Sequence, residues 1–468
     1  MSLPGLRSLT RLLFMVASIS TLAGAVPWKP GGHVQYTSNP IPNHYIIQYH
    51  HGTNIETRRK HEVETHNFAV SMGDYRGVMK RFQIGDFSAY HGEFHPDHIE
   101  QLRANSPQIK AIHPDEEVRL TSHSPKKNPK HPQHPDLDKP HAAKGPHHHD
   151  PNKPHEAKKP PTPQLPPNIH IAAPGNWGQA RLSHRDLPKA SARYIYERPD
   201  TTVYVIDSGI VTSHWQFATE TGGSRAYWGA NFANDKDEDE IGHGTHVAGI
   251  IGGKTVGVAP NTKLIAVKIF GSEAVGSWST ILQGLEWAGN DTARRGGASR
   301  TVVNLSLGGG AGQCIDDAVT ALSKNHSITV VVAAGNDNNA TEYYSPARCP
   351  AVITVGSIGR TDHRSSFSNW GPEVDVFAPG EDILSAFISE DGDVNATRVC
   401  GGTSMASPFV AGLAAYFLDL YGPMGPERMR GVIEHWATKG KVKDVKGSKN
   451  WIAFNGVEGR WKGFDEDW

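Results

Sequence analysis

Four polar side chains that could together perform acyl transfer lie at the ends of apolar segments of this chain. They are Asp207 after VYVI, His243 within GHGTHVAG, Asn336 within VAAGND and Ser404 within GGTSMASP. Acyl transfer needs a hydroxyl nucleophile, a base for its proton, a carboxylate that orients the base, and a donor for the oxyanion. Each residue alone has a common structural explanation, such as a helix cap, a turn or close packing. The presence of all four group types favours catalysis.

The elements that must position these residues are predicted from continuous apolar runs. The runs are VYVI (203–206), LIAVKIF (264–270), VVNLSL (302–307), ITVVVAA (328–334), AVITVGS (351–357) and VDVF (374–377). Such β-branched runs are typical of strands buried on both faces of a parallel sheet. Amphipathic patterns at 277–295 and 314–325 predict helices between them. The predicted fold is therefore α/β, a doubly wound, mostly parallel sheet with functional groups at the carboxyl ends of its strands.

The whole chain divides into four predicted segments. Residues 1–25 read as a secretory signal peptide, with arginines before a short apolar run and a small-residue cleavage pattern. Residues 26–120 read as a small α+β domain, with strand patterns at 44–50 and 108–120 and a helix at 96–105. Residues 121–168, rich in His, Pro and Lys, read as a disordered linker. The α/β domain is expected over 169–468.

Composition limits the partners of the chain. The 468 residues include 47 Lys and Arg and 48 Asp and Glu, so nothing favours nucleic acid or an acidic membrane surface. No apolar run reaches the roughly 20 residues of a membrane helix. We expect a secreted, extracellular, soluble monomer that has neither nucleic acid nor membrane as a partner.

Four motifs resemble those of one family. DSGI, GHGTHVAG, AAGN and GTSMASP, in this order, resemble the subtilases, the subtilisin-like serine proteases, and SLGGG and DVFAPG fit the same pattern. Within that family the chain looks most similar to the secreted proteinase K-like branch. The resemblance covers roughly residues 180–440. It implies a subtilisin-like fold and a serine endopeptidase that acts on protein or peptide substrates.

The resemblance also implies roles for individual residues. Ser404 is similar to the nucleophile, His243 to the general base and acid, Asp207 to the orienting carboxylate, and Asn336 to an oxyanion donor beside the Ser404 N–H. Two substrate-pairing segments and one pocket are implied as well. They are Val275, Gly276 and Ser277; Ser306, Leu307 and Gly308; and the pocket residues Ala333, Ala334 and Gly335.

Specificity is expected to be broad, with a preference for large apolar or aromatic residues before the scissile bond. The acidic run DKDEDE (235–240) could instead indicate basic specificity, although a solvated loop is the simpler interpretation.

Residues 44–120 resemble the inhibitory propeptide of the family, a small ferredoxin-like chaperone. The resemblance implies a zymogen that cleaves itself and has its own propeptide as inhibitor and folding partner. The cut could fall near Leu120, which would leave the basic tract on the mature enzyme, or after the tract.

Three further features follow from the resemblance or from short motifs. A structural calcium ion is implied at Pro350, Val352 and Asp375, all oxygen donors, and no catalytic cofactor is implied. Of the three cysteines, Cys314 and Cys349 are implied as a disulfide, with Cys400 as a free thiol. Glycosylation sequons occur at Asn290, Asn325, Asn339 and Asn395, and the sequon at Asn304 should be buried.

A second hypothesis is a catalytically inert secreted protein on a decayed protease scaffold, whose His-rich tract captures metal. The presence of all four catalytic residue types argues for the enzyme.

Overall fold

The computed structural model describes residues 39–120, 170–188, 194–196, 201–388, 393 and 395–456. These residues all belong to one compact unit, Tyr36–Trp468. The predicted signal peptide (1–25) and the His/Pro/Lys tract (121–168) lie outside the described residues.

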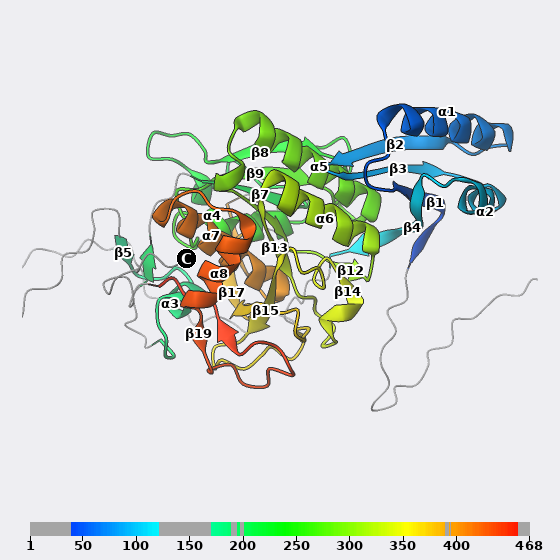
Figure 1. The fold of residues 1–468 in the computed structure, drawn as a ribbon. Helices are drawn as coiled ribbons and strands as arrows, with labels where there is room; N and C mark the ends of the chain where they lie inside the picture. The colour runs from blue at the N-terminus through cyan, green and yellow to red at the C-terminus, as the bar shows by residue number, and fades with distance from the viewer. Residues whose placement is uncertain are drawn as a thin grey trace, which may run out of the picture. The chain divides into compact units, whose positions relative to one another are not determined.

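The N-terminal part of the described chain is a small α+β domain, as predicted (Figure 1). Its elements are β1 (Pro40–Tyr49), α1 (Ile55–Ser71), β2 (Gly77–Ile84), β3 (Phe87–Glu93), α2 (Pro96–Asn105) and β4 (Ile109–Arg119). The antiparallel sheet has the order β10-β4-β1-β3-β2, and its fifth strand, β10 (Val275–Ser277), comes from much later in the chain. Ile47, Tyr90 and Phe94 are fully buried in its core.

The larger domain is built on a nine-stranded sheet with the order β19-β20-β16-β15-β13-β11-β7-β9-β8. All neighbours are parallel except β19 and β20. In chain order the strands are β7 (Thr202–Asp207), β8 (Ala226–Asn231), β9 (Lys263–Lys268), β11 (Thr301–Leu305), β13 (Thr329–Ala333), β15 (Ile353–Ile358), β16 (Val376–Pro379), β19 (Thr438–Lys439) and β20 (Trp451–Ile452). The predicted α/β class is confirmed.

Helices cover both faces of this sheet (Figure 1). They are α3 (Trp177–Leu182), α4 (His243–Gly252), α5 (Trp278–Arg295), α6 (Gln313–His326), α7 (Thr403–Leu420) and α8 (Pro426–Trp436). Alternate residues of β7 enter two separate cores: Val203 and Val205 pack with α4 and α7, whereas Tyr204 and Ile206 pack with α5 and α6. This alternation explains why the strand is apolar at each position from 203 to 206. None of the described helices combines the length and hydrophobicity that crossing a bilayer requires.

Three short two-stranded sheets and three single turns of 3-10 helix complete the described structure. They are β5 (His170–Ala172) with β6 (Tyr194–Tyr196), β12 (Gly309–Gly310) with β14 (Tyr344–Ser345), β17 (Ile383–Ala386) with β18 (Thr397–Cys400), and the turns Trp215–Phe217, Ala298–Arg300 and Thr341–Tyr343.

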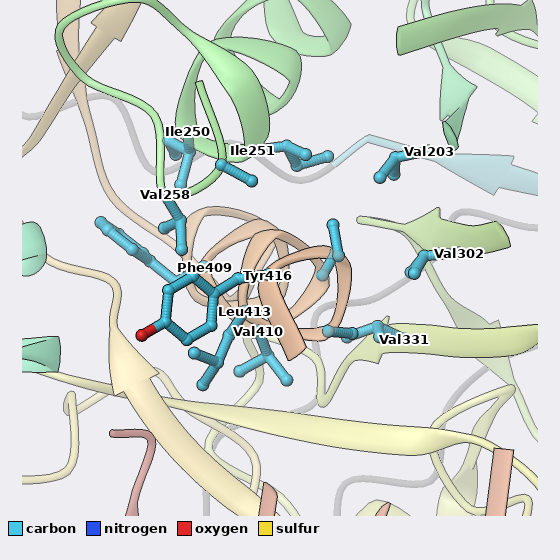
Figure 2. Close-up of a cluster of buried hydrophobic side chains, with 14 of the residues drawn as sticks. Val203, Ile250, Ile251, Val258, Val302, Val331, Phe409, Val410, Leu413 and Tyr416 are labelled. Atoms are coloured by element: carbon cyan, nitrogen blue, oxygen red, sulfur yellow. The ribbon is translucent and has the colours of Figure 1, made fainter. Parts of the chain in front are cut away.

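Helix α7 is buried on nearly all sides. Figure 2 shows Phe409, Leu413 and Tyr416 of this helix between α4 and the strands. A methyl group at Gly412 would lie only 2.7 Å from Val258, so this glycine permits the close approach. The close packing fixes the N-terminal turn of α7, which carries Ser404.

Candidate active site

Asp207 and His243 form a buried, hydrogen-bonded pair where β7 ends and α4 begins. The Nδ1–H of His243 donates to both carboxylate oxygens of Asp207, at 2.8 and 3.0 Å. Both side chains are buried. Because Nδ1 is engaged, Nε2 is the ring nitrogen left to accept a proton.

Burial by itself would lower the pKa of His243, since it disfavours the charged ring. The charge of Asp207 and its hydrogen bond outweigh burial, and the charge of Asp239 adds to them, so the pKa of His243 is raised above its usual value. This environment stabilises an imidazolium, the state that a general base reaches after it takes a proton.

Asp239 holds the start of helix α4 and was missed by the sequence analysis, which placed it in a solvated loop. Its Oδ1 accepts from the N–H of Gly242 at 2.8 Å and from the Ser208 hydroxyl at 2.8 Å. Its Oδ2 accepts from the N–H and the hydroxyl of Thr245, at 2.9 and 2.6 Å. A buried carboxylate at a helix N-terminus satisfies donors that the helix leaves unpaired. Asp239 therefore fixes the turn that carries His243.

Ser404 lies in the first turn of α7 and is tied to the end of β11. The Ser404 hydroxyl donates to the Ser306 carbonyl at 3.1 Å, and the Ser306 hydroxyl donates to the Ser404 carbonyl at 2.8 Å. Asn304 donates to the Ser306 hydroxyl at 2.9 Å and accepts from Ser407 at 2.8 Å. These bonds fix the nucleophile candidate against the central strand. The predicted burial of Asn304 is confirmed.

Asn336 follows β13 and faces the same turn of α7. Its amide oxygen accepts from the N–H and the hydroxyl of Thr403, at 2.8 and 2.9 Å. Thr403 in turn accepts from the N–H of Gly335 at 3.1 Å. The amide orientation is therefore fixed by the residue that precedes Ser404.

The segment predicted to pair with substrate, Val275–Ser277, is strand β10. It pairs antiparallel with β4, with Val275 opposite Arg119, Gly276 opposite Val118, and Ser277 opposite Glu117. One more hydrogen bond follows, from the N–H of Leu120 to the carbonyl of Ala274 at 3.1 Å. The end of the N-terminal domain thus lies on the predicted substrate edge.

The other predicted substrate-binding positions differ in detail from the expectation. Residues 306–308 follow β11 without forming a strand. The methyl group of Ala334 packs with Val374 and Phe377 and therefore points into the core. Gly335 has φ of 103°, and a Cβ there would lie 2.2 Å from the Asn369 amide. Only glycine fits that position.

The three oxygens expected to bind calcium do not fit a metal ion in this structure. Arg430 donates to the carbonyl of Pro350 at 2.7 Å and also to the carbonyl of Val352. Lys449 lies 3.1 Å from the carboxylate of Asp375. Two side-chain cations therefore engage the oxygens that calcium would need, and calcium requires six to eight such ligands.

The expected disulfide is absent: Cys314, Cys349 and Cys400 are all free. Cys349 contacts the hydroxyl of Thr320 at 3.2 Å and the carbonyl of Asp316 at 3.5 Å, both on α6. Residues 316 and 320 lie on a side of the helix different from that of residue 314. The prediction failed because Cys349 packs against the part of α6 that holds residues 316 and 320, whereas the side chain of Cys314 leaves the helix in a different direction.

The sequons lie in different surroundings. Asn290 and Asn395 are exposed, and Asn339 is half-buried. Asn325 faces the β2–β3 turn of the N-terminal domain, where a Cβ on Gly85 would lie 2.4 Å from its side chain. Asn325 is exposed, and a glycan on it would lie directly beside this turn.

Comparison with known families defines the class. The chain belongs to the subtilase family, whose sequence pattern matches residues 198–451. Residues 44–121 match the peptidase inhibitor I9 family. The chain is thus a subtilisin-like serine protease with an inhibitory propeptide, which confirms the resemblance and favours the enzyme over the inert metal-binding protein.

Named relatives agree with this class. The chain is 34% identical to Alkaline protease 1 of Aspergillus clavatus over 97% of this chain and 100% of the relative. It is 43% identical to a cuticle-degrading serine protease of Arthrobotrys oligospora over 60% of this chain and 68% of the relative. The crystal structure of a cold adapted subtilisin-like serine proteinase matches with a TM-score of 0.53 at 36% identity, over 60% of this chain and 97% of that one.

Proposed function

We propose that the chain is the precursor of a secreted endopeptidase in which Ser404 attacks the scissile carbonyl. His243 accepts the hydroxyl proton at Nε2 and later delivers it to the leaving amine. Asp207 keeps the ring in the required tautomer and stabilises the imidazolium. The reaction requires the Ser404 hydroxyl to exchange its hydrogen bond with Ser306 for one with His243.

One observation carries this proposal: the bond from His243 Nδ1 to Asp207, 2.8 Å long and buried. A buried, charged orienting group is needed for catalysis but is costly for structure alone. The oxyanion forms near the N–H of Ser404 and the amide of Asn336, whose orientation by Thr403 supports the donor role.

We propose that substrates bind as an added strand on β10, with residues 306–308 on their other side and the segment Ala333–Gly335 near the side chain before the scissile bond. Support comes from the propeptide, whose strand β4 pairs with β10. The preference is for large apolar or aromatic residues at that position. The residue-level roles and the domain limits given above stay predictions.

We propose that self-cleavage occurs shortly after Leu120, because the pairing with β10 continues to that residue. The His/Pro/Lys tract then remains at the N-terminus of the mature enzyme.

The test is N-terminal sequencing of the secreted protein beside the variant Ser404→Ala. We expect a mature start within a few residues of Leu120, and a Ser404→Ala precursor that stays uncut when purified. Ser213→Ala, which removes an exposed hydroxyl from the same domain, is the control and should still be processed. Self-processing of purified Ser404→Ala would refute the nucleophile, and a start beyond residue 168 would refute the cleavage position.

A further inference from the structure

A second group of charged residues lies away from the active site, where helix α8 meets the turn before β15. Two carbonyls of this turn, those of Pro350 and Val352, both accept from Nη2 of Arg430, the first at 2.7 Å. One nitrogen therefore bridges two main-chain oxygens, as a bound cation does. The Nε of Arg430 lies 4.0 Å from Asp375 Oδ1.

A lysine completes the arrangement from the other side. Nζ of Lys449 lies 3.1 Å from Oδ1 of Asp375 and 2.6 Å from Oε1 of Glu434, and Glu434 is one turn after Arg430 on α8. Oδ2 of Asp375 accepts from the N–H of Thr354 at 2.9 Å. The cluster contains two cations and two carboxylates, so its charges balance without an added ion.

The position of these groups argues for a role in holding the structure together. The Asp375 side chain is 8% exposed, while those of Arg430 and Lys449 are 28% and 34% exposed. A carboxylate this buried needs a paired cation. The turn Cys349–Val352 and helix α8 lie far apart in the sequence, and Arg430 connects them through its hydrogen bonds to two carbonyls of the turn.

We infer that Arg430, assisted by Lys449, is a built-in cation that takes the place of a divalent metal ion at this turn and ties α8 to β15. Entry of a divalent ion between the same oxygens would bring its charge against the guanidinium, which holds its charge at all relevant pH values. Among the described residues no group of three or more His, Cys, Asp or Glu side chains could hold a metal ion instead.

A built-in cation determines how the protein responds to chelators. The stabilisation that a bound ion gives a fold depends on the free concentration of the ion, whereas a side chain cannot dissociate. This part of the fold should therefore be equally stable with and without calcium.

Thermal unfolding of the full chain tests this, with Ser404→Ala as the background so that digestion does not interfere. We expect any change in Tm between millimolar calcium and EDTA to be the same in this chain and in its Asp375→Asn variant. Asparagine keeps the acceptor for Thr354 but removes the charge that a metal needs. A calcium-dependent rise in Tm that Asp375→Asn abolishes would overturn the inference.

The second arm replaces the arginine. Arg430→Leu keeps an apolar stem but leaves two carbonyls and Asp375 without their cation, so Tm should fall by about 5 °C. Arg428→Leu, an exposed arginine of the same helix, is the matched control and should have little effect. Equal effects of the two changes would overturn the inference. Should Arg430→Leu fail to fold, the calcium comparison still decides, because it leaves Arg430 unchanged.

Discussion

Thr403 holds Asn336 by two hydrogen bonds, one from its N–H at 2.8 Å and one from its hydroxyl at 2.9 Å, both to the amide oxygen. Since the amide is planar, fixing its oxygen also fixes the direction of its two N–H bonds. Thr403 precedes Ser404, so the residue that orients the proposed oxyanion donor is directly adjacent to the proposed nucleophile. Preorganised donors of this kind act without reorganisation during the reaction.

Asn336→Ala should lower kcat by about 10²–10³ with little change in KM, because its donor acts on the transition state. That magnitude was measured within the subtilisin family itself. Thr403→Val should lower kcat less, since the backbone bond to Asn336 remains, and Thr403→Ser should restore activity. Steady-state kinetics on one peptide substrate checks all three. A change confined to KM would contradict the oxyanion role.

Asp239→Asn should weaken the start of α4 and change the pH profile together. The donors around Asp239 use both of its carboxylate oxygens, whereas the asparagine amide offers only one acceptor oxygen. Leaving buried donors without an acceptor costs about 1–3 kcal/mol in the free energy of unfolding. Because the charge of Asp239 raises the pKa of His243, its removal lowers that pKa. The acid limb of kcat/KM should therefore move to lower pH.

Asp235→Asn is the control for this prediction, because it removes an exposed carboxylate from the same loop. Thermal unfolding and a pH–rate profile are measured for both. A profile that stays in place while Asp239→Asn loses stability would limit Asp239 to a purely structural role.

The contact between the propeptide and the peptidase domain should weaken in acid. His91 lies 3.4 Å from Asp115, and Asp115 accepts from the N–H and the hydroxyl of Ser279 at the start of α5, at 3.0 and 2.6 Å. Burial lowers the pKa of His91 to about 4, although Asp115 opposes the shift. A group with a lowered pKa in the packed state takes up a proton when it is released.

The packed state is therefore disfavoured as pH falls from about 6.5, the ordinary histidine value, towards about 4. We expect the cleaved propeptide to dissociate more readily over this range, as followed by gel filtration. His91→Gln should flatten the dependence, and His50→Gln, at an exposed histidine of the same domain, should not. An unchanged dependence in His91→Gln would assign the effect to other groups.

The three thiols should all be titratable in denaturant, since none forms a disulfide. In the native protein they should react slowly at neutral pH, because burial raises the pKa of Cys400 to about 11 and also raises the pKa values of Cys314 and Cys349. Timed reaction with a disulfide reagent, with and without denaturant, measures both. Fewer than three reactive thiols in protein that is unfolded without a reducing agent would show that a disulfide exists.

Six strands of the central sheet could be predicted closely because each lies in a continuous apolar run: β7, β9, β11, β13, β15 and β16. Helix α1 could not be predicted, because polar and apolar residues occupy the opposite of their usual positions. The helix buries His61, Glu62 and Thr65, while Ile55 and Val63 are exposed. Strand β8 was missed as well, since it lies at the edge of the sheet and is only partly buried. Periodicity reports burial on one apolar face, and neither element has such a face.

The residue types of the site could be predicted from the motifs, but their supporting residues could not. Asp239 lies in a run of charges that reads as solvent-exposed, and its only signal is an acidic residue shortly before a helix start. Arg430 has no sequence signal, because its partners are main-chain carbonyls some 80 positions earlier. Contacts of this kind depend on how distant elements pack.

Strand β10 belongs to the sheet of the propeptide as much as to the peptidase domain. The propeptide alone therefore has an open edge along β4, and the mature enzyme has an open edge along β10. Both edges become unpaired when the cleaved propeptide dissociates, and the enzyme's edge is the one that a protein substrate would then fill. A change in the backbone of residues 275–277 must consequently alter self-inhibition and substrate capture together, so neither property can be tuned there without the other.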